Sequence, residues 1–428
     1  MNYLILNRSA LAIRPYREWM GDGHRLLLIT DARALSADDE IRGEQLASFD
    51  AAVPLVDYHD SVAVEREALR LHAEFGFDEI IALSEFDLLR AARLRDLLGL
   101  AGQSEESAVA FRDKLVMKDL LREAGVPLAP YAPAPDVTSL IRFTQQHGFP
   151  IVVKPRRGGG SMGVEILHDE DELWDYATRT TELGTDDGAP LLVEAHVEHE
   201  LFHIDGLVVD GHIRLIWPST QGTTTCLGML DGQMLHSTML DADDPRLDDL
   251  RKLTTTALET LPTPTTTIFH AEVFGTPDGL VFNEIACRMA GGRIEEQIRL
   301  GFGLHLPKLY IRALAGHELP RIPSEPARIG GLALFPPRPG LLRAVPGECR
   351  VPGISSFTVS VAAGTRLGTA HASVDNFASA LAVGSTRAEV EQAIGRLRTW
   401  VETETVIEPE PETEPETEPR TPTGGTTA

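Results

Sequence analysis

The sequence predicts a mixed α/β (α+β) protein in which a parallel sheet with crossover helices precedes antiparallel sheets. Between Tyr3 and Glu85, the short apolar runs YLILN, RLLLITD and EIIALSE alternate with helical patterns, which is typical of parallel strands. After Leu191, alternating segments are separated by Asp-Gly turns at 210–211 and 278–279, and such turns favour antiparallel hairpins. No GxGxxG sequence follows the first strand, so a dinucleotide site is not supported there.

Local patterns also predict a helix between these regions, and further elements and a tail after them. The pattern FRDKLVMKDLLREAG is helical, and Gly125 and Pro127 end it. From Ile329 to Val401 we expect further strands and one helix. After Glu408 the chain repeats Glu-Pro and Glu-Thr, and we expect this tail to be disordered because proline and like charges prevent a core.

The length of the chain predicts several lobes, and its charge excludes some classes of partner. The chain has 428 residues, whereas a single core usually stops growing at about 250 to 300, so we expect two or three lobes. The formal net charge of −25 would repel phosphate backbones and anionic lipids, so neither nucleic acid nor a membrane is expected as a partner. No segment approaches the roughly 20 apolar residues that a membrane helix needs.

The N-terminus and the cysteines favour a cytoplasmic protein. The apolar run at the start reaches Arg8 too early for a signal peptide, and we expect it to form the first strand. Cys226, Cys287 and Cys349 are widely separated, which predicts neither a disulfide framework nor a cysteine metal site.

A glycine-rich segment follows a predicted buried strand in PIVVKPRRGGGSMGVEIL, residues 150–167. Its glycines allow backbone N–H groups to approach an anion, because no side chain blocks them and positive φ is allowed. Phosphate is the ligand we expect, although the strand–loop–strand context and the missing GK[ST] sequence distinguish this loop from a P-loop. A flexible hairpin loop is the alternative interpretation. The glycines are Gly158, Gly159, Gly160 and Gly163.

Two lysines lie where an unpaired charge would be costly. Lys154 belongs to the apolar strand before the glycines, and Lys114 lies near the start of the predicted helix. A buried ammonium group requires an anion, and a polyphosphate would pair with both lysines. Ordinary salt bridges are the alternative.

A pair of glutamates followed by an arginine forms the second group of candidate residues. Glu272 and Glu284 belong to strands joined by a short turn, so they can face each other and share a divalent cation that relieves their repulsion. Oxygen-only ligation is what Mg²⁺ prefers. Arg288 shares the face of Glu284 and could hold a phosphoryl group or a carboxylate, and the Gly291-Gly292 pair could offer N–H donors to an oxyanion. A surface salt-bridge ladder is the alternative.

A less regular segment, Glu194 to Val197, ends another apolar strand, and its backbone could hydrogen-bond an adenine edge. His203 and Asp205 then alternate onto one face of the next strand. For these residues an ordinary structural contact is an equally good interpretation.

The order of these motifs carries a resemblance. The chain begins this series with RDK and MK, followed by GVP. Next come the strand lysine with its glycine-rich loop, then LVE, then HIDGLVVDG, and last the glutamate pair with the Arg and Gly-Gly that follow it. This order resembles the ATP-grasp superfamily, and most of all its carboxylate-amine ligases, the group of L-amino acid ligases and relatives of biotin carboxylase. The resemblance implies an ATP-grasp fold with a Rossmann-like parallel-sheet domain at 1–103, a central subdomain with the glycine-rich loop at 104–190, an antiparallel-sheet C-terminal domain with a terminal subdomain at 191–407, and the tail at 408–428.

The resemblance also implies roles for the candidate residues. Lys114 and Lys154 would contact the phosphates of ATP, and Arg288 and Lys154 would act in catalysis. Glu272 and Glu284 would bind Mg²⁺, for which Mn²⁺ is an alternative. The other nucleotide contacts that it implies are Gly158, Gly159, Gly160, Ser161, Met162, Gly163, Glu194, Ala195, His196, Val197 and His203.

The implied reaction joins a small carboxylic acid to an amine, with an amino acid among the substrates. ATP would be cleaved to ADP and phosphate through an acyl-phosphate, giving an amide or peptide bond. Two alternatives are a biotin-type carboxylase, in which bicarbonate is the acid, and a non-catalytic ATP-binding regulatory protein. A homodimer is the default expectation for a soluble enzyme.

Next to the expected metal ligands the sequence departs from the resemblance. Many members carry Asn two residues after the second metal-binding glutamate, whereas this chain has Ala286. With a period of two, Asn283 should lie on the face opposite Glu284, so we do not expect it to substitute.

Overall fold

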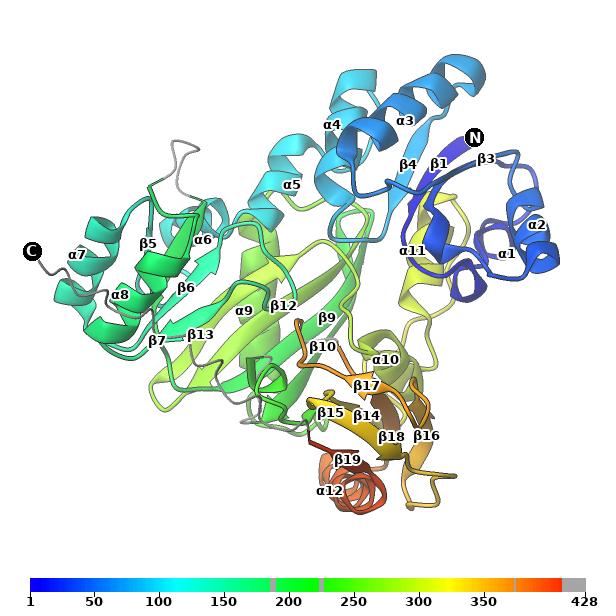
Figure 1. The fold of residues 1–428 in the computed structure, drawn as a ribbon. Helices are drawn as coiled ribbons and strands as arrows, with labels where there is room; N and C mark the ends of the chain where they lie inside the picture. The colour runs from blue at the N-terminus through cyan, green and yellow to red at the C-terminus, as the bar shows by residue number, and fades with distance from the viewer. Residues whose placement is uncertain (185–189, 223–226, 373–374, 410–428) are drawn as a thin grey trace, which may run out of the picture.

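The fold has an N-terminal lobe, a central lobe and a large C-terminal sheet in this computed structural model, which describes residues 1–184, 190–222, 227–372 and 375–409. Figure 1 shows the central lobe at the left and the N-terminal lobe at the upper right, with the large sheet running from the left to the lower right. Cys226 and most of the acidic tail, the segment expected to be disordered, lie outside the described residues.

The N-terminal lobe is a parallel sheet in the order β3-β2-β1-β4, as the sequence predicted. Helices cover both faces, so its strands are buried on both sides. On β1, Leu4 and Leu6 pack under α3 and α4, whereas Tyr3 and Ile5 pack with α1 and with the much later helix α11 (Leu306–Leu314). The elements are β1 (Asn2–Asn7), α1 (Tyr16–Met20), β2 (Arg25–Asp31), α2 (Asp39–Ala47), β3 (Ala51–Leu55), α3 (Ser61–Phe75), β4 (Glu79–Ala82) and α4 (Leu88–Leu98).

The central lobe is a small antiparallel sheet in the order β5-β8-β6-β7, covered on one face by α7 and α8. Strand β8 pairs with β6 in this sheet, although the division expected after residue 190 would place β8 with the following segment. The elements are α5 (Glu105–Arg112), α6 (Lys114–Glu123), β5 (Tyr131–Pro133), α7 (Val137–His147), β6 (Ile151–Pro155), β7 (Glu165–Leu167), α8 (Glu170–Arg179) and β8 (Leu191–Ala195).

The large sheet has the order β13-β12-β9-β10-β11-β14-β18-β16, and both predicted Asp-Gly turns connect antiparallel partners in it. Its elements are β9 (Glu200–Val209), β10 (His212–Gly222), β11 (Leu235–Met239), α9 (Leu247–Thr260), β12 (Thr267–Thr276), β13 (Gly279–Ala286), α10 (Ile294–Phe302), β14 (Ile329–Phe335), β16 (Ile354–Val359), β18 (Ala378–Gly384) and α12 (Arg387–Glu404). A three-stranded sheet, β17-β15-β19, completes the C-terminal region with β15 (Gly340–Ala344), β17 (Arg366–Leu367) and β19 (Val406–Glu408).

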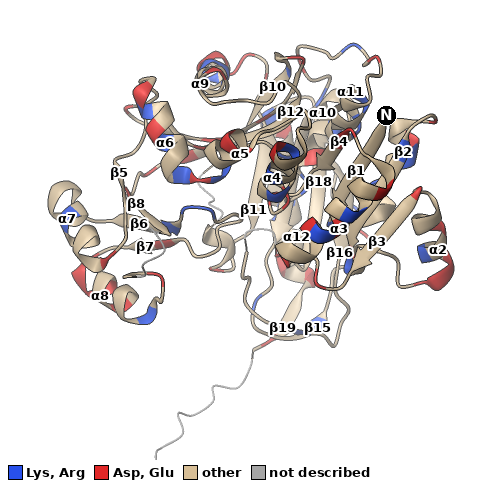
Figure 2. Ribbon diagram, turned by 90° about the horizontal axis from the view of Figure 1, so that it is seen from above, with Lys and Arg blue, Asp and Glu red and all other residues tan. Residues whose placement is uncertain are grey.

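The exposed surface carries much of the acidic charge. In Figure 2, Asp and Glu mark the outer helices α2 and α8, whose first turns are acidic. Across the described part of the chain, every helix is too short or too polar to cross a membrane.

Candidate functional site

A pocket lies between the central sheet and the large sheet, and the alternation of strand residues determines which side chains face it. On β6, Ile151 and Val153 are buried under α7 and α8, so Lys154 faces the pocket. On β12, Ala271 and Val273 belong to the core, and Glu272 faces the pocket. The pocket brings together most of the residues singled out in the sequence: Lys114, Lys154, Gly158, Gly159, Gly160, Ser161, Met162, Glu194, Ala195, His196, Val197, Glu272, Glu284 and Arg288.

The glycine-rich loop connects β6 to β7, which pair as an antiparallel hairpin. At Gly163 the φ is +70°, and a Cβ there would lie 2.9 Å from Pro155 Cγ, so a side chain does not fit. Gly163 therefore shapes the turn, and it is not itself among the described residues that line the pocket. Gly158 faces the pocket and accepts a hydrogen bond from Lys114 Nζ through its carbonyl, at 3.0 Å.

The buried lysine of β6 pairs with a glutamate of the neighbouring strand. Lys154 Nζ lies 2.8 Å from Glu194 Oε2, and Lys118 Nζ of helix α6 lies 2.9 Å from Glu194 Oε1. Burial disfavours the charged form of Glu194, but the two lysines outweigh it and hold the pKa of this carboxyl below its usual range. The Glu194 side chain therefore neutralises lysine charge, while its backbone was the part expected to contact adenine.

The other candidate lysine pairs with a candidate metal ligand. Lys114 begins helix α6, and its Nζ lies 3.0 Å from Glu284 Oε2. Burial raises the pKa of Glu284, but Lys114 and Lys154 outweigh this effect and lower the pKa to about 2. Glu284 is thus ionised at any physiological pH.

The two candidate metal ligands are direct partners, as the sequence predicted. Glu272 on β12 pairs with Glu284 on β13, and a β-bulge follows immediately, where Val273 pairs with Phe282. The bulge leaves Asn283 as an extra residue on β13. The expectation that Asn283 faces away is wrong, because its side chain lines the pocket, donating from Nδ2 to Glu272 Oε2 at 2.9 Å and accepting from Lys154 Nζ at 3.4 Å.

The arginine that follows this pair is held by the N-terminal lobe. Arg288 Nε and Arg112 Nη1 both donate to the carboxylate of Glu85, which follows strand β4. Arg112 also donates to Arg157 O at the start of the glycine-rich loop, at 2.8 Å. The two guanidinium groups outweigh the effect of burial and keep the pKa of Glu85 below its usual range.

His203, expected as a nucleotide contact, is instead enclosed. It is 1% exposed, its Nδ1 lies 2.6 Å from Asp205 Oδ2, and its Nε2 lies 2.6 Å from Ser237 Oγ. Since both ring nitrogens have partners and its neighbours cover it, His203 does not line the pocket within the described residues. It supports Ser237, which does line it.

Asp205 also accepts from a second histidine. The Nδ1 of His270 lies 2.9 Å from Asp205 Oδ1, and its Nε2 lies 3.7 Å from Glu272 Oε1. Burial opposes charge on this ring, but Asp205 more than offsets it and raises the pKa of His270 to about 9. The pocket therefore contains a charged imidazole beside Glu272.

The segment around the end of β8 has some of its backbone N–H groups already hydrogen-bonded. Ala195 N donates to Pro130 O at 2.9 Å, and His196 N donates to Pro150 O at 3.1 Å. The His199 ring stacks on Phe274 with centroids 3.8 Å apart, and both rings line the pocket.

Comparisons with known proteins agree with this arrangement. Residues 119–291 match the family model of the ATP-grasp domain, and residues 332–406 match that of the L-amino acid ligase C-terminal domain 2. The central part of the chain therefore matches the ATP-grasp domain, and the C-terminal part matches a domain of L-amino acid ligases. The chain is homologous to L-amino acid ligases and biotin carboxylases.

Two curated relatives and one solved structure show how far the similarity to known proteins extends. The L-arginine-specific L-amino acid ligase of Bacillus subtilis is 30% identical over 236 residues, which are 54% of this chain and 56% of that protein. The biotin carboxylase of Pseudomonas aeruginosa is 33% identical over 202 residues, 44% of this chain and 43% of that protein. The chain thus spans about half the length of these curated relatives. The crystal structure of L-amino acid ligase from Bacillus licheniformis has the same fold, with a TM-score of 0.72, 18% identity and coverage of 96% of this chain and 99% of that one.

The donor set of this pocket fits a magnesium ion. Glu272 and Glu284 offer carboxylate oxygens from directly paired positions, and the low pKa of Glu284 keeps it unprotonated. Hard oxygen donors with room for water and phosphate are what Mg²⁺ requires.

Sequence reasoning missed several residues of the site. Lys118 could have been found, since it lies four positions after Lys114 and shares its face of the helix. Glu85 follows a parallel strand at its carboxyl end, the edge where ligands of such sheets usually bind. His270 and Ser237 gave no signal, because their significance comes from pairing across the large sheet.

Proposed function

We propose that this protein is an ATP-dependent carboxylate-amine ligase, which forms an amide or peptide bond through an acyl-phosphate. One observation carries the proposal: Lys114, Lys154 and the glycine-rich loop face the Glu272–Glu284 pair across one pocket. Cations and loop N–H groups suit a polyphosphate, and paired carboxylates suit its metal ion. The homology to L-amino acid ligases supports the same conclusion.

The reaction proceeds in two balanced steps. A carboxylate oxygen of the acid attacks the γ-phosphorus of ATP, the bond to the β-γ bridging oxygen breaks, and ADP leaves. The amine nitrogen then attacks the carbonyl carbon of the acyl-phosphate, phosphate leaves, and the amine loses a proton. Positioning and charge neutralisation supply most of the rate in such transfers.

The chain's residues have separable roles in this scheme. Lys114 and Lys154 hold the phosphates, and Gly158 to Met162 cover them. Glu272 and Glu284 hold Mg²⁺, or Mn²⁺ in its place, and the bound ion would neutralise charge on the transferred group. Arg288, oriented by Glu85, binds the phosphoryl group or the carboxylate of the acid.

The part of the pocket that β11 and β14 line favours an acid with an apolar side chain. Leu235 and Ser237 on β11 pair with Leu334 and Leu332 on β14, and all four residues line the pocket. Ile294, at the start of α10, also lines it. Because these side chains carry no charge, a charged substrate side chain would lose its hydration there without a partner. We therefore infer that an apolar amino acid provides the carboxylate.

A biotin-type carboxylase is the second candidate, and the homology to biotin carboxylase favours it. In that case bicarbonate would be the acid, and ATP cleavage would need bicarbonate but no free amine. We also propose a cytoplasmic homodimer. We place the lobe divisions near residue 103 and after β8, because β8 pairs with β6 in the central sheet.

The deciding experiment incubates the purified protein with ATP, Mg²⁺ and pooled amino acids and small acids. We expect ADP rather than AMP, together with a condensation product that mass spectrometry finds one water lighter than its two substrates. Omitting apolar amino acids should remove most of the product. ADP release that depends on bicarbonate alone would indicate the carboxylase, and nucleotide binding without turnover would indicate a regulatory protein.

A further inference from the structure

Asn283 is the residue that the β-bulge inserts between the two paired positions Glu272–Glu284 and Val273–Phe282. In a regular strand it would face away from Glu284. The bulge turns its side chain toward the pocket, where it is 7% exposed. Bulges commonly redirect a side chain next to a functional site.

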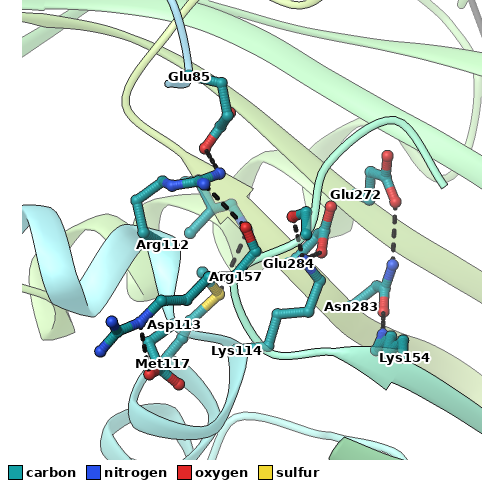
Figure 3. Close-up of polar contacts among 12 residues, drawn as sticks. Glu85, Arg112, Asp113, Lys114, Met117, Lys154, Arg157, Glu272, Asn283 and Glu284 are labelled. Atoms are coloured by element: carbon teal, nitrogen blue, oxygen red, sulfur yellow. Dashed lines mark hydrogen bonds and ion pairs between the residues drawn. The ribbon is translucent and has the colours of Figure 1, made fainter. Parts of the chain in front are cut away.

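The Asn283 amide connects two residues of opposite charge. Its Nδ2 donates to Glu272 Oε2 at 2.9 Å, and its Oδ1 accepts from Lys154 Nζ at 3.4 Å. Figure 3 shows the two bonds as a continuous chain from Lys154 through Asn283 to Glu272. A carboxamide is suited to this position, because it offers a donor to a carboxylate and an acceptor to an ammonium group at once.

We propose that Asn283 is a positioning residue that couples the phosphate-binding lysine to the metal-binding carboxylate. The inference rests on the proposed function, which assigns those roles to Lys154 and Glu272. Through Asn283, Glu272 is held in one orientation before the metal arrives, and Lys154 is kept on the nucleotide side of the pocket. Pre-oriented ligands bind more tightly because less conformational freedom is lost on binding.

The test measures how strongly Mg²⁺ increases ADP affinity. Calorimetry with ADP in EDTA and ADP with excess Mg²⁺ gives two dissociation constants, and their ratio is the metal enhancement. Asn283→Leu keeps the branched arrangement of heavy atoms but loses both hydrogen bonds. We expect the enhancement to fall about tenfold, as loss of a charge-assisted hydrogen bond implies. Nucleotide affinity without metal should also fall, because Lys154 loses a partner.

A second variant separates positioning from a merely structural role. Asn283→Asp keeps the size and the acceptor for Lys154 but adds a negative charge 2.9 Å from Glu272. The extra charge should repel metal-free ADP and attract Mg²⁺, so the enhancement should rise above that of the native protein. If the bulge required only a polar side chain for its structure, the Leu and Asp variants would not change the metal enhancement in opposite directions.

The control is Thr276→Val, which removes a side-chain hydrogen bond to Gly279 O from the turn of the same hairpin, outside the pocket. It should leave the enhancement unchanged. A lower metal enhancement in the Leu variant together with a higher one in the Asp variant supports the proposal. Any other pattern in folded protein overturns it. If the Leu variant fails to fold, the Asp variant decides alone. A native protein that binds neither ADP nor MgADP would instead overturn the proposed function.

Discussion

Lys114 Nζ lies 3.0 Å from Glu284 Oε2, so a lysine predicted to bind phosphate and a glutamate predicted to bind metal neutralise each other. The two residues come from helix α6 and strand β13 and meet across the pocket, as Figure 3 shows. Neither charge is left without a partner before ligands bind, which would otherwise be costly. A magnesium nucleotide supplies both partners, and so could replace this ion pair with two new ones.

Glu284→Gln should abolish ADP production while leaving the fold intact, because it removes a full charge from the metal site but keeps the size of the side chain. We expect kcat to fall by about a hundredfold or more, on the scale seen when one charge-stabilising group is lost. Glu200→Gln is the matched control. Glu200 begins β9 of the same sheet and pairs with Arg246, and its side chain is 30% exposed against 27% for Glu284. Unchanged ADP production in the Glu284 variant would exclude the proposed metal site.

Lys154→Met should raise the Michaelis constant for ATP about tenfold or more, because a charge-assisted contact to phosphate is lost. It should also lower the free energy of unfolding by about 1–3 kcal/mol, since the buried Glu194 keeps only one lysine partner. Lys118→Met is the control, because Lys118 binds the same carboxylate but does not line the pocket among the described residues. If the two variants have equal Michaelis constants, Lys154 has no direct phosphate contact.

Glu85→Gln should lower kcat about tenfold with little effect on the Michaelis constant for ATP. The reason is that Arg288 loses the charged partner that orients it, while the nucleotide contacts stay in place. Glu79→Gln offers a control of similar burial, with a side chain 12% exposed against 13% for Glu85 and an arginine partner, Arg95, in the N-terminal lobe. Steady-state kinetics of both variants distinguish a role at the site from a loss of stability.

Asp113→Asn should destabilise the fold in a pH-dependent way. Asp113 caps helix α6 and forms an ion pair with Arg156 at 2.8 Å. Burial raises the pKa of Asp113, but Arg156 and the other partners outweigh burial and lower this pKa. A carboxyl with a lowered folded-state pKa contributes stability above its unfolded value of about 3.9 and loses it as the pH falls through the folded value. Urea unfolding should therefore show a loss of about 1–2 kcal/mol at pH 7 that disappears in acid. A difference that persists at pH 2.5 would mean that the charge is not responsible.

The elements of the fold were predictable where one local pattern decided them. Alternation and Asp-Gly turns indicated the β9–β10 and β12–β13 hairpins, and the glycines indicated the loop after Lys154. The boundary between the central lobe and the large sheet could not be predicted as well, because only pairing with β6 shows that β8 belongs to the central sheet.

The candidate site was predictable in composition but not in its contacts. Residue type and order singled out Lys114, Lys154, Glu272, Glu284 and Arg288, and the pocket contains all five. A period of two placed Asn283 on the wrong face, because a single-residue bulge reverses the alternation and leaves no clear sign in the sequence. His203 was misjudged for a related reason: its neighbours Asp205 and Ser237 lie on the same and on a distant strand, and only the folded sheet shows that they enclose it.

Helix α11 limits how this chain can be cut and how it can fold. Ile311 belongs to the same hydrophobic cluster as Tyr3 and Ile5, and Tyr3 Oη donates to Leu314 O at 3.2 Å. A fragment that ends before residue 306 would leave one side of the first sheet covered only in part, by α1, and prone to aggregate. During synthesis, the packing of the N-terminal sheet is therefore complete only after some three hundred further residues have been made. The N-terminal lobe thus depends on a segment encoded far downstream.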